Sequence, residues 1–264
     1  KKKKEKTKNL MQASRTFEDL VQLVKILRKE CPWDRKQTHE SIKDNLVEEV
    51  YEALEALEND DFEEFKKELG DLLLHVVFHS VMASESTRFT IEDVIETLME
   101  KLIRRHPHVF GEKVVHSEEE VSENWEMIKK KEGKKSTLDG LPKPMPALIR
   151  AQRMQEKAAN VGFDWPEWEQ AWEKVEEETQ EFKETLASGS AKDRAEEFGD
   201  LLFSMVNMGR FFDLHAEDSL RLTNTKFERR FRYIEQQAEK ENRPLNDLSL
   251  EEMDKHWKAA KKAL

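Results

Sequence analysis

Two short stretches, Glu68-Leu-Gly-Asp71-Leu-Leu and Glu197-Phe-Gly-Asp200-Leu-Leu, decide the fold of this chain. Each places one carboxylate three residues before another and continues into apolar residues. Residues three apart lie on the same face of a helix, so we expect each pair of carboxylates to point to the same side. The second stretch repeats the first, which indicates two copies of one helical module.

Other features recur in the same order in both halves of the chain. A Glu-Glu-x-x-Glu pattern precedes each stretch, and a lysine followed four residues later by an arginine comes after it. These repeats comprise Glu48-Glu49-x-x-Glu52 with Lys101 and Arg105, and Glu177-Glu178-x-x-Glu181 with Lys226 and Arg230. A repeat of this kind is typical of a chain built from similar structural units.

Apolar residues follow helical spacing along almost the whole chain. Ser or Thr three residues before an acidic residue predicts helix starts at Thr90, Ser117 and Ser249. No segment alternates with a period of two, so the predicted fold is all-α, with two tandem modules forming helical bundles. We expect helices near residues 17–27, 46–57, 62–78, 91–102, from 117, from 147, and near 168–186, 192–213, 216–241 and 249–263.

A break in the helical pattern divides the chain. Residues 133–146 hold two of the eight glycines and three of the seven prolines. Proline removes a helical hydrogen-bond donor and restricts the residue before it. We therefore predict an N-terminal helical domain at 1–132, a linker at 133–146 and a C-terminal helical domain at 147–264.

The composition excludes several protein classes. The net charge is −11, which disfavours nucleic acid and anionic membranes as partners. One cysteine, Cys31, excludes a disulfide framework, and no apolar run is long enough to cross a membrane. No secretory leader is visible, and the basic run at residues 1–6 is interpreted as a solvated tail. These features predict a cytoplasmic protein that binds neither nucleic acid nor membrane.

Carboxylates beside apolar residues indicate a metal site. Glu49 borders an apolar helical stripe, and Asp71 opens a run that is apolar nearly all round. Carboxylates that lose water and lie together raise one another's pKa, and a divalent cation such as Mg²⁺ or Mn²⁺ relieves this. The short link near residues 59–60 predicts an antiparallel helix pair. The predicted ligands are Glu49, Glu52, Glu68 and Asp71 in the first half, and Glu178, Glu181, Glu197 and Asp200 in the second.

The alternative to a metal site is a solvated acidic face, which is the usual role of a single Glu-x-x-Glu pair. The doubling of the pattern favours metal. Gly70 and Gly199 lie within the same helices, where glycine costs about 1 kcal/mol relative to alanine. We expect close helix approach to be the reason for both glycines.

Cations downstream of the carboxylates complete a phosphate site. Lys226 and Arg230 lie one turn apart, as do Lys101 and Arg105. Such cations together with Mg²⁺ suit phosphate oxygens, although helix-end cations are often only solvated. Trp257 stacks on a base or fills the core, and the sequence leaves both roles open.

In these motifs the chain resembles the MazG family of nucleoside triphosphate pyrophosphohydrolases. The likeness rests on Glu-Glu-x-x-Glu, a spacer and Glu-x-x-Asp, which occur once in each half. Residues 31–39, Cys-Pro-Trp-Asp-Arg-Lys-Gln-Thr-His, and residues 105–111, Arg-His-Pro-His-Val-Phe-Gly, are also similar to the first MazG domain. The block Lys226-Phe-Glu-Arg-Arg230 is similar to the nucleotide contacts of the second domain.

The resemblance implies hydrolysis of a nucleoside triphosphate to the monophosphate and pyrophosphate, with Mg²⁺ as cofactor and broad specificity. It also implies a homodimer that completes four-helix bundles. Glu48 or Glu177 is the candidate proton acceptor, and Lys174 is expected to join the phosphate contacts. Two residues before the lysine, the second half has the polar Asn224 where the first half has Met99. We therefore predict the second half as the main nucleotide site.

Two alternatives remain open at this stage. The chain could be an all-α pyrophosphohydrolase specific for one nucleotide, such as dUTP or a phosphoribosyl nucleotide resembling phosphoribosyl-ATP. It could also be a non-enzymatic helical module whose acidic faces bind a partner. Spacing alone does not reveal the shape of a base pocket, so base and sugar preference stay undetermined.

Overall fold

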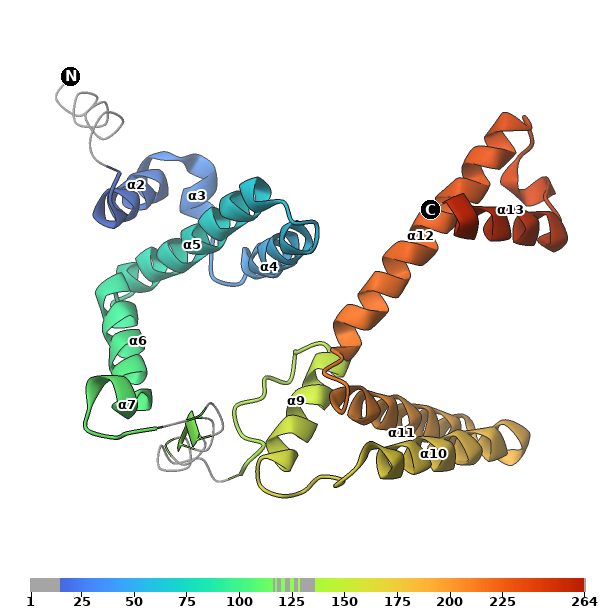
Figure 1. Cartoon of the computed structure of the whole chain (residues 1–264). Coiled ribbons are helices and arrows are strands. Elements are labelled where there is room, and N and C mark those ends of the chain that lie inside the picture. The colour runs from blue at the N-terminus through green and yellow to red at the C-terminus, as the bar shows by residue number, and fades with distance from the viewer. Residues whose placement is uncertain are drawn as a thin grey trace. The chain divides into compact units, whose positions relative to one another are not determined.

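The computed structural model describes residues 15–115, 117, 120, 121, 124, 125, 128 and 136–263. These residues form helices and connecting loops, without a strand among them. The chain divides into two compact units, Lys1–His116 and Ser117–Leu264 (Figure 1). The predicted all-α class is confirmed. None of the helices within the described ranges is long and apolar enough to cross a membrane.

The linker predicted at 133–146 stays a prediction, since residues 133–135 lie outside the described part of the chain. The basic run at residues 1–6 lies outside it as well, as does most of the helix predicted from Ser117. The backbone NH of Glu120 donates to the Ser117 hydroxyl at 3.3 Å, as the predicted helix start requires.

The first unit is built around a long central helix. Its core gathers side chains from α2, α5 and α6, among them the fully buried Val24 and Val77. The chain reverses direction between α4 and α5 at Asp60, which has a φ of 56°. The described helices are α2 (Phe17–Glu30), α3 (Pro32–Lys36), α4 (Lys43–Glu58), α5 (Phe62–Glu85), α6 (Ile91–Arg105) and α7 (Pro107–Phe110).

The second unit contains two helix pairs. One pair, α10 and α11, packs against α9, and the other, α12 and α13, shares a small core around Ile234, Ala238 and Leu248 (Figure 1). The described elements are α9 (Ala147–Ala159), α10 (Trp168–Ser188), α11 (Ala191–Arg210), α12 (Ala216–Lys240), the short 3-10 helix η1 (Leu245–Asp247) and α13 (Leu250–Ala263).

Capping residues set several helix starts where the sequence predicts them. At α6, the Thr90 hydroxyl accepts from the backbone NH of Asp93, whose carboxylate accepts from the Thr90 backbone NH at 2.7 Å. Ser249 and Glu252 make the same reciprocal pair at α13. Each pair satisfies two backbone donors that a helix start leaves free.

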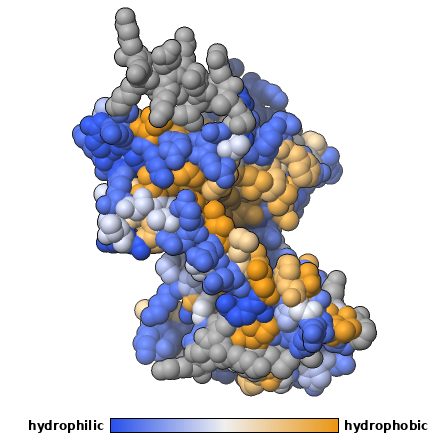
Figure 2. Space-filling model, turned by 90° about the vertical axis from the view of Figure 1, so that its left-hand side faces the viewer, coloured by the Kyte–Doolittle hydropathy of each residue, from blue (hydrophilic) through white to orange (hydrophobic). Residues whose placement is uncertain are grey.

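Many large apolar side chains remain exposed on the helix pairs. In the space-filling view, apolar side chains lie at the surface among charged ones (Figure 2). The exposed set includes Leu69, Leu73 and Val76 on α5, and Phe198, Leu202 and Met205 on α11. The described helices that pack against α5 and α11 cover their other sides, so these apolar residues lack a cover within the described chain.

The expected reason for the helix glycines is wrong within the described chain. A Cβ built at Gly70 or at Gly199 meets no described atom within 4 Å outside its own helix turns and chain neighbours. Neither glycine therefore permits close approach of another described helix. Both face the open side of their helix pair.

Candidate metal and nucleotide site

The first carboxylate group is formed by α4 and α5. Glu49, Glu68 and Asp71 each offer an oxygen, and these three oxygens lie within 4.8 Å of one another. Glu49 lies on α4 about three turns before the reversal at Asp60, and Glu68 and Asp71 lie on α5 about two and three turns after it. Glu68 is only 8% exposed, so the group includes a buried carboxylate.

The environment of Glu49 opposes its negative charge. Burial, followed by the nearby charges of Asp71, Glu52 and Glu68, raises the pKa of Glu49 to about 7. Burial also raises the pKa of Glu68, with Glu52 as the leading neighbouring charge. Carboxylates in this arrangement repel one another and lose water, so the group suits a cation.

The second carboxylate group repeats the first on α10 and α11. Glu178, Glu197 and Asp200 bring their oxygens within 4.8 Å of one another. Glu178 is 6% exposed, and its Oε2 atom is buried without a hydrogen-bond partner among the described residues. Burial raises the pKa of Glu197, and the charges of Glu181, Glu178 and Asp200 add to this.

Lys174 distinguishes the second group from the first. Its ammonium lies 2.7 Å from Oε1 of Glu178 and donates to Oε1 of Glu177 at 2.8 Å. These two bonds, with the Glu177 bond first, raise the pKa of Lys174. The first half has the uncharged Asn45 four residues before Glu49, so no cation of α4 occupies this place.

The remaining predicted acids lie at the edges of the two groups. Glu52 and Glu181 are exposed and stand outside both sets of close oxygens, although each raises the pKa of a group member. Glu48 is exposed, and Glu177 is exposed and paired with Lys174. The metal and proton-transfer roles of these four residues stay predictions.

The prediction that Asp71 is removed from water is wrong. Asp71 and its counterpart Asp200 are both exposed. The apolar residues that follow Asp71 are partly exposed too, with Leu73 at 40% and Val76 at 45%. The run is apolar nearly all round in sequence, but the described helices that pack against α5 leave the side with Leu73 and Val76 uncovered.

A pocket of about 480 Å³ opens beside the second carboxylate group. Glu178 and Asp200 lie at its lining together with Lys174. Its other walls are largely apolar and include the aromatic rings of Phe163, Trp165 and Phe203. Gln155 and Asn207 are among the few polar side chains of these walls. A concave, mostly apolar site with a few converging polar groups is the usual form of a small-molecule site.

An ion pair fixes the loop that forms one wall of the pocket. The Arg210 guanidinium at the end of α11 bonds the carboxylate of Asp164, and only 11% of the Arg210 side chain is exposed. Asp164 stands between Phe163 and Trp165, so this bond holds both rings beside α11.

The predicted phosphate contacts lie on other helices. Arg230 of α12 places its guanidinium 5.5 Å from the centre of the Trp257 ring of α13, and the ring of Phe227 is 5.2 Å away. Trp257 packs against the core of this helix pair, which favours the core role. In the described chain, Lys226 and Arg230 do not line the pocket. Asn224 is exposed, whereas Lys101 and Arg105 are partly exposed on α6.

Imidazoles occupy the corresponding place in the first unit. His39 and His79 lie with their Nδ1 atoms 2.8 Å apart and their rings stacked. The ring of His75 is 6.0 Å from that of His79. Counted from the carboxylates, His75 and His79 correspond to Ser204 and Met208. The two units therefore share their acids but differ beside them.

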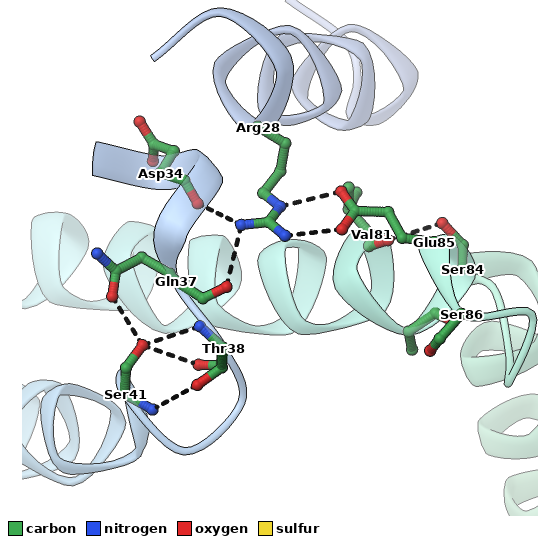
Figure 3. A network of polar contacts seen from close by, with 10 residues as sticks. Arg28, Asp34, Gln37, Thr38, Ser41, Val81, Ser84, Glu85 and Ser86 are labelled. Atoms are coloured by element: carbon green, nitrogen blue, oxygen red, sulfur yellow. Dashed lines mark hydrogen bonds and ion pairs between the residues drawn. The ribbon is translucent and has the colours of Figure 1, made fainter. Parts of the chain in front are cut away.

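A second guanidinium anchors the loop that carries His39. Arg28 of α2 donates to both oxygens of Glu85 at 3.0 and 2.7 Å, and to the carbonyl oxygens of Asp34 and Gln37 (Figure 3). The Ser41 hydroxyl donates to Gln37 at 2.7 Å and closes the turn. These bonds tie α2, α3 and the following loop to the end of α5.

Both acidic groups fit a divalent cation. Each offers at least three carboxylate oxygens within bridging range, and oxygen donors of this kind suit Mg²⁺ and Mn²⁺. The buried Oε2 of Glu178 without a described partner and the raised pKa of Glu49 point the same way. The pocket was not predicted from the sequence. The signal in the sequence is the aromatic pair of Phe163 and Trp165 shortly before the carboxylate helix, and both rings are exposed in the structure.

Comparison with known proteins places both units in one family. A model of the MazG nucleotide pyrophosphohydrolase domain matches residues 37–110 and, separately, residues 168–234. The two matches contain the two carboxylate groups and confirm the predicted tandem repeat.

Relatives of known name support the same assignment. A nucleoside triphosphate pyrophosphohydrolase/pyrophosphatase MazG of Thermotoga maritima is 48% identical over 257 residues, which are 96% of this chain and 98% of that protein. A nucleoside triphosphate pyrophosphohydrolase of Escherichia coli K12 is 40% identical over 240 residues, 88% of this chain and 90% of that protein. A crystal structure of a mazG-related protein from Thermotoga maritima covers 43% of this chain and 98% of its own, with 28% identity and a TM-score of 0.39. The predicted enzyme class, a hydrolase, is confirmed, and the chain belongs to the MazG nucleotide pyrophosphohydrolase family, in the form that carries the domain twice.

Proposed function

We propose that this enzyme hydrolyses nucleoside triphosphates to the monophosphate and pyrophosphate, with Mg²⁺ as the cofactor and with broad specificity. The observation that carries the proposal is the second carboxylate group opening directly into a pocket of nucleotide size. Beside the first carboxylate group lie the imidazoles of His75 and His79 instead. We therefore propose the second unit as the principal site.

The residues of the second unit divide the chemistry among them. Bound Mg²⁺ would neutralise phosphate charge and make a water molecule more acidic. Glu178, Glu197 and Asp200 would hold it, with Glu181 at the edge of the group. Glu177, exposed one residue before Glu178, would accept the proton of the attacking water, and Glu48 would do so in the first unit. Lys174 already lies between Glu177 and Glu178 and would turn to a phosphate oxygen.

A homodimer is part of this proposal. The uncovered apolar faces of α5 and α11 are of the kind that marks a protein interface. Pairing two such helix pairs makes a four-helix bundle with a closed apolar core. The same pairing would bring further cations, Lys226 and Arg230 or Lys101 and Arg105, to a carboxylate group of the other copy. Light scattering should report twice the mass of one chain, and Leu202→Lys should shift the mass towards one chain.

Product analysis tests the reaction directly. The protein is incubated with ATP, GTP, CTP, UTP and their deoxy forms with and without Mg²⁺, and the products are separated. Monophosphate plus pyrophosphate, formed only with the metal and from most substrates, is the expected result. Diphosphate plus phosphate would contradict the reaction. Turnover confined to one nucleotide would replace broad specificity with the single-substrate alternative.

Matched substitutions show which unit works. We expect Glu197→Gln to reduce kcat by about a hundredfold or more, since it removes a metal ligand from the proposed main site. Glu68→Gln should have a smaller effect on total turnover. Glu196→Gln and Glu55→Gln, exposed neighbours on the same helix pairs, serve as controls and should leave kcat within about twofold.

A further inference from the structure

Besides Oε2 of Glu178, a second side chain that lines the pocket has a buried polar atom without a described partner. Gln155 of α9 is 6% exposed and lines the pocket. Its side-chain Nε2 donates to the backbone carbonyl of Phe203 at 2.8 Å. Its Oε1 is buried and has no hydrogen-bond partner within the described part of the chain.

The Phe203 carbonyl fixes which way the Gln155 amide points. A carbonyl oxygen only accepts hydrogen bonds, so the amide nitrogen must face it and the amide oxygen must face away. Gln155 lines the pocket, and its unpaired polar atom is therefore an acceptor and not a donor. An unpaired buried acceptor is costly, and a ligand N–H that reaches it removes that cost.

The walls around this acceptor suit a flat ring. Phe163, Trp165 and Phe203 line the pocket and are 82%, 45% and 44% exposed. Exposed aromatic faces stack on nucleobases, and this stacking tolerates different bases. The Arg210–Asp164 ion pair holds the loop that carries the first two rings.

Further polar atoms of the pocket lie on one helix. Asn207 and Ser204 of α11 line it on the same side as Asp200. The Asn207 side chain makes no hydrogen bond to another described residue, so its amide is available to a ligand. The Ser204 hydroxyl donates to the Leu201 carbonyl at 2.8 Å and keeps its lone pairs.

We propose that this pocket holds the nucleobase of the substrate and that the Gln155 amide oxygen accepts a hydrogen bond from a base N–H. The inference rests on the proposed function, because it places the base beside the carboxylates that would hold the metal. Adenine and cytosine offer an exocyclic amine to this acceptor, and guanine and uracil offer a ring N–H. The contact therefore selects a hydrogen-bonding base without selecting among the four, in agreement with the proposed broad specificity.

Pairs of ligands that differ by the N–H donor test the contact. Binding of AMP is compared with that of purine riboside 5′-monophosphate, and CMP with pyrimidin-2-one riboside 5′-monophosphate, by calorimetry with Mg²⁺. Monophosphates are not hydrolysed, so the affinity is measured without turnover. We expect each donor-bearing nucleotide to bind about tenfold more tightly to the wild-type protein, the usual scale for leaving a buried acceptor unpaired.

Gln155→Leu removes the acceptor and keeps the approximate volume. We expect this variant to bind both members of each pair equally. Gln152→Leu is the matched control: Gln152 is also buried on α9, but it bonds His215 and the backbone NH of Ala216 and does not line the pocket. It should change stability while the tenfold preference remains. Trp165→Ala should weaken all four ligands alike.

Equal affinity within each pair for the wild-type protein would overturn the proposal, whether or not the Gln155 variant folds. So would a preference that persists in Gln155→Leu, or the absence of binding by all four at millimolar concentration. Failure of the proposed function looks different, since it is seen in the triphosphate assay as the wrong products or none. An enzyme that releases pyrophosphate but ignores the base donor would overturn this inference alone.

Discussion

The ammonium of Lys174 lies 2.7 Å from Oε1 of Glu178, while Oε2 of the same carboxylate is buried without a described partner. The two oxygens thus differ, since a cation of the chain holds one and the other has no described partner, in a carboxylate that lies within 4.8 Å of oxygens of Glu197 and Asp200. This arrangement balances a buried charge before metal binds, because one positive group already faces it. It leaves a second oxygen for the metal.

Lys174→Met tests whether the ammonium balances the buried charge of Glu178. Without the ammonium, the three carboxylates lose their nearest cation, and we expect the melting temperature of the metal-free protein to fall by about 3–6 °C, the scale of roughly 1–2 kcal/mol. Mg²⁺ should raise the melting temperature of the variant by more than it raises that of the wild-type protein, since bound metal stabilises by mass action. Thermal unfolding with EDTA and with Mg²⁺ measures both quantities.

Lys183→Met on the exposed face of the same helix is the control, and it should change neither value. If Mg²⁺ raised the melting temperature of the wild-type protein and of Lys174→Met by the same amount, the ammonium would not balance the charge of Glu178. If neither protein responded to Mg²⁺, the metal assignment itself would be wrong.

Local chemistry allowed much of the fold to be predicted. Thr90 with Asp93 and Ser249 with Glu252 mark helix starts through reciprocal bonds within one turn, so a few residues suffice to predict them. The carboxylate groups follow from the three-residue spacing of Glu68 and Asp71 and a short reversal. The short helix α3 was not predicted, although it begins at Pro32 and proline is favoured at a first helical position.

What the sequence did not predict depends on contacts between distant residues. The pocket exists because Arg210 holds the loop at Asp164, 46 residues away, and because Gln155 bonds the backbone of Phe203. Neither contact leaves a periodic signal. The exposure of Asp71 was also unpredictable from its apolar neighbours, since the number of covering helices decides it. The same uncovered face explains why Gly70 meets no described helix.

Gly70→Ala tests whether that face is free. A Cβ here meets no described atom nearby, so at low protein concentration, where the proposed dimer dissociates, alanine should stabilise the chain by about 0.5–1 kcal/mol through helix propensity alone. Chemical denaturation at low and high protein concentration measures the free energy of unfolding. A loss of stability confined to high concentration would mean that a helix of a second copy packs against Gly70.

The contacts of Arg28 with Glu85 and with two backbone carbonyls predict a loss of stability when Arg28 is replaced. Arg28 ties three segments to α5 through its two bonds to Glu85 and its bonds to two carbonyls (Figure 3), and 11% of its side chain is exposed. Arg28→Met keeps most of the aliphatic stem but leaves the carbonyls of Asp34 and Gln37 without this donor. We expect a loss of about 2 kcal/mol in the free energy of unfolding, and Lys29→Met on the exposed side of α2 should lose almost nothing.

A double substitution separates the ion pair from the carbonyl bonds. Glu85 is half-exposed, so Glu85→Gln should cost less than Arg28→Met. In the double variant we expect nearly the loss of Arg28→Met alone, because the two side chains share one interaction. Simple addition of the two single losses would contradict the network.

Glu252 provides a test of stability against pH. Its carboxylate accepts from Arg243 at 2.7 Å and from the Ser249 backbone NH at 2.8 Å. The Arg243 bond, followed by the two Ser249 bonds, lowers the pKa of Glu252 to about 2. A pKa that is lower in the folded state than in the unfolded state stabilises the fold above the unfolded value, and this contribution fades as pH falls from there through the folded value.

Glu252→Gln should therefore lower the melting temperature at pH 7 by about 1–3 °C, the scale of an exposed capping ion pair. The difference from wild type should shrink as pH falls from about 4.5 towards 2, because protonation then removes the same charge from the wild-type protein. Glu251→Gln, the exposed neighbour, should give no such pH-dependent difference. A Glu252→Gln difference of the same size at pH 7 and pH 3 would mean that the charge on Glu252 does not stabilise α13, since only a charge effect fades on protonation.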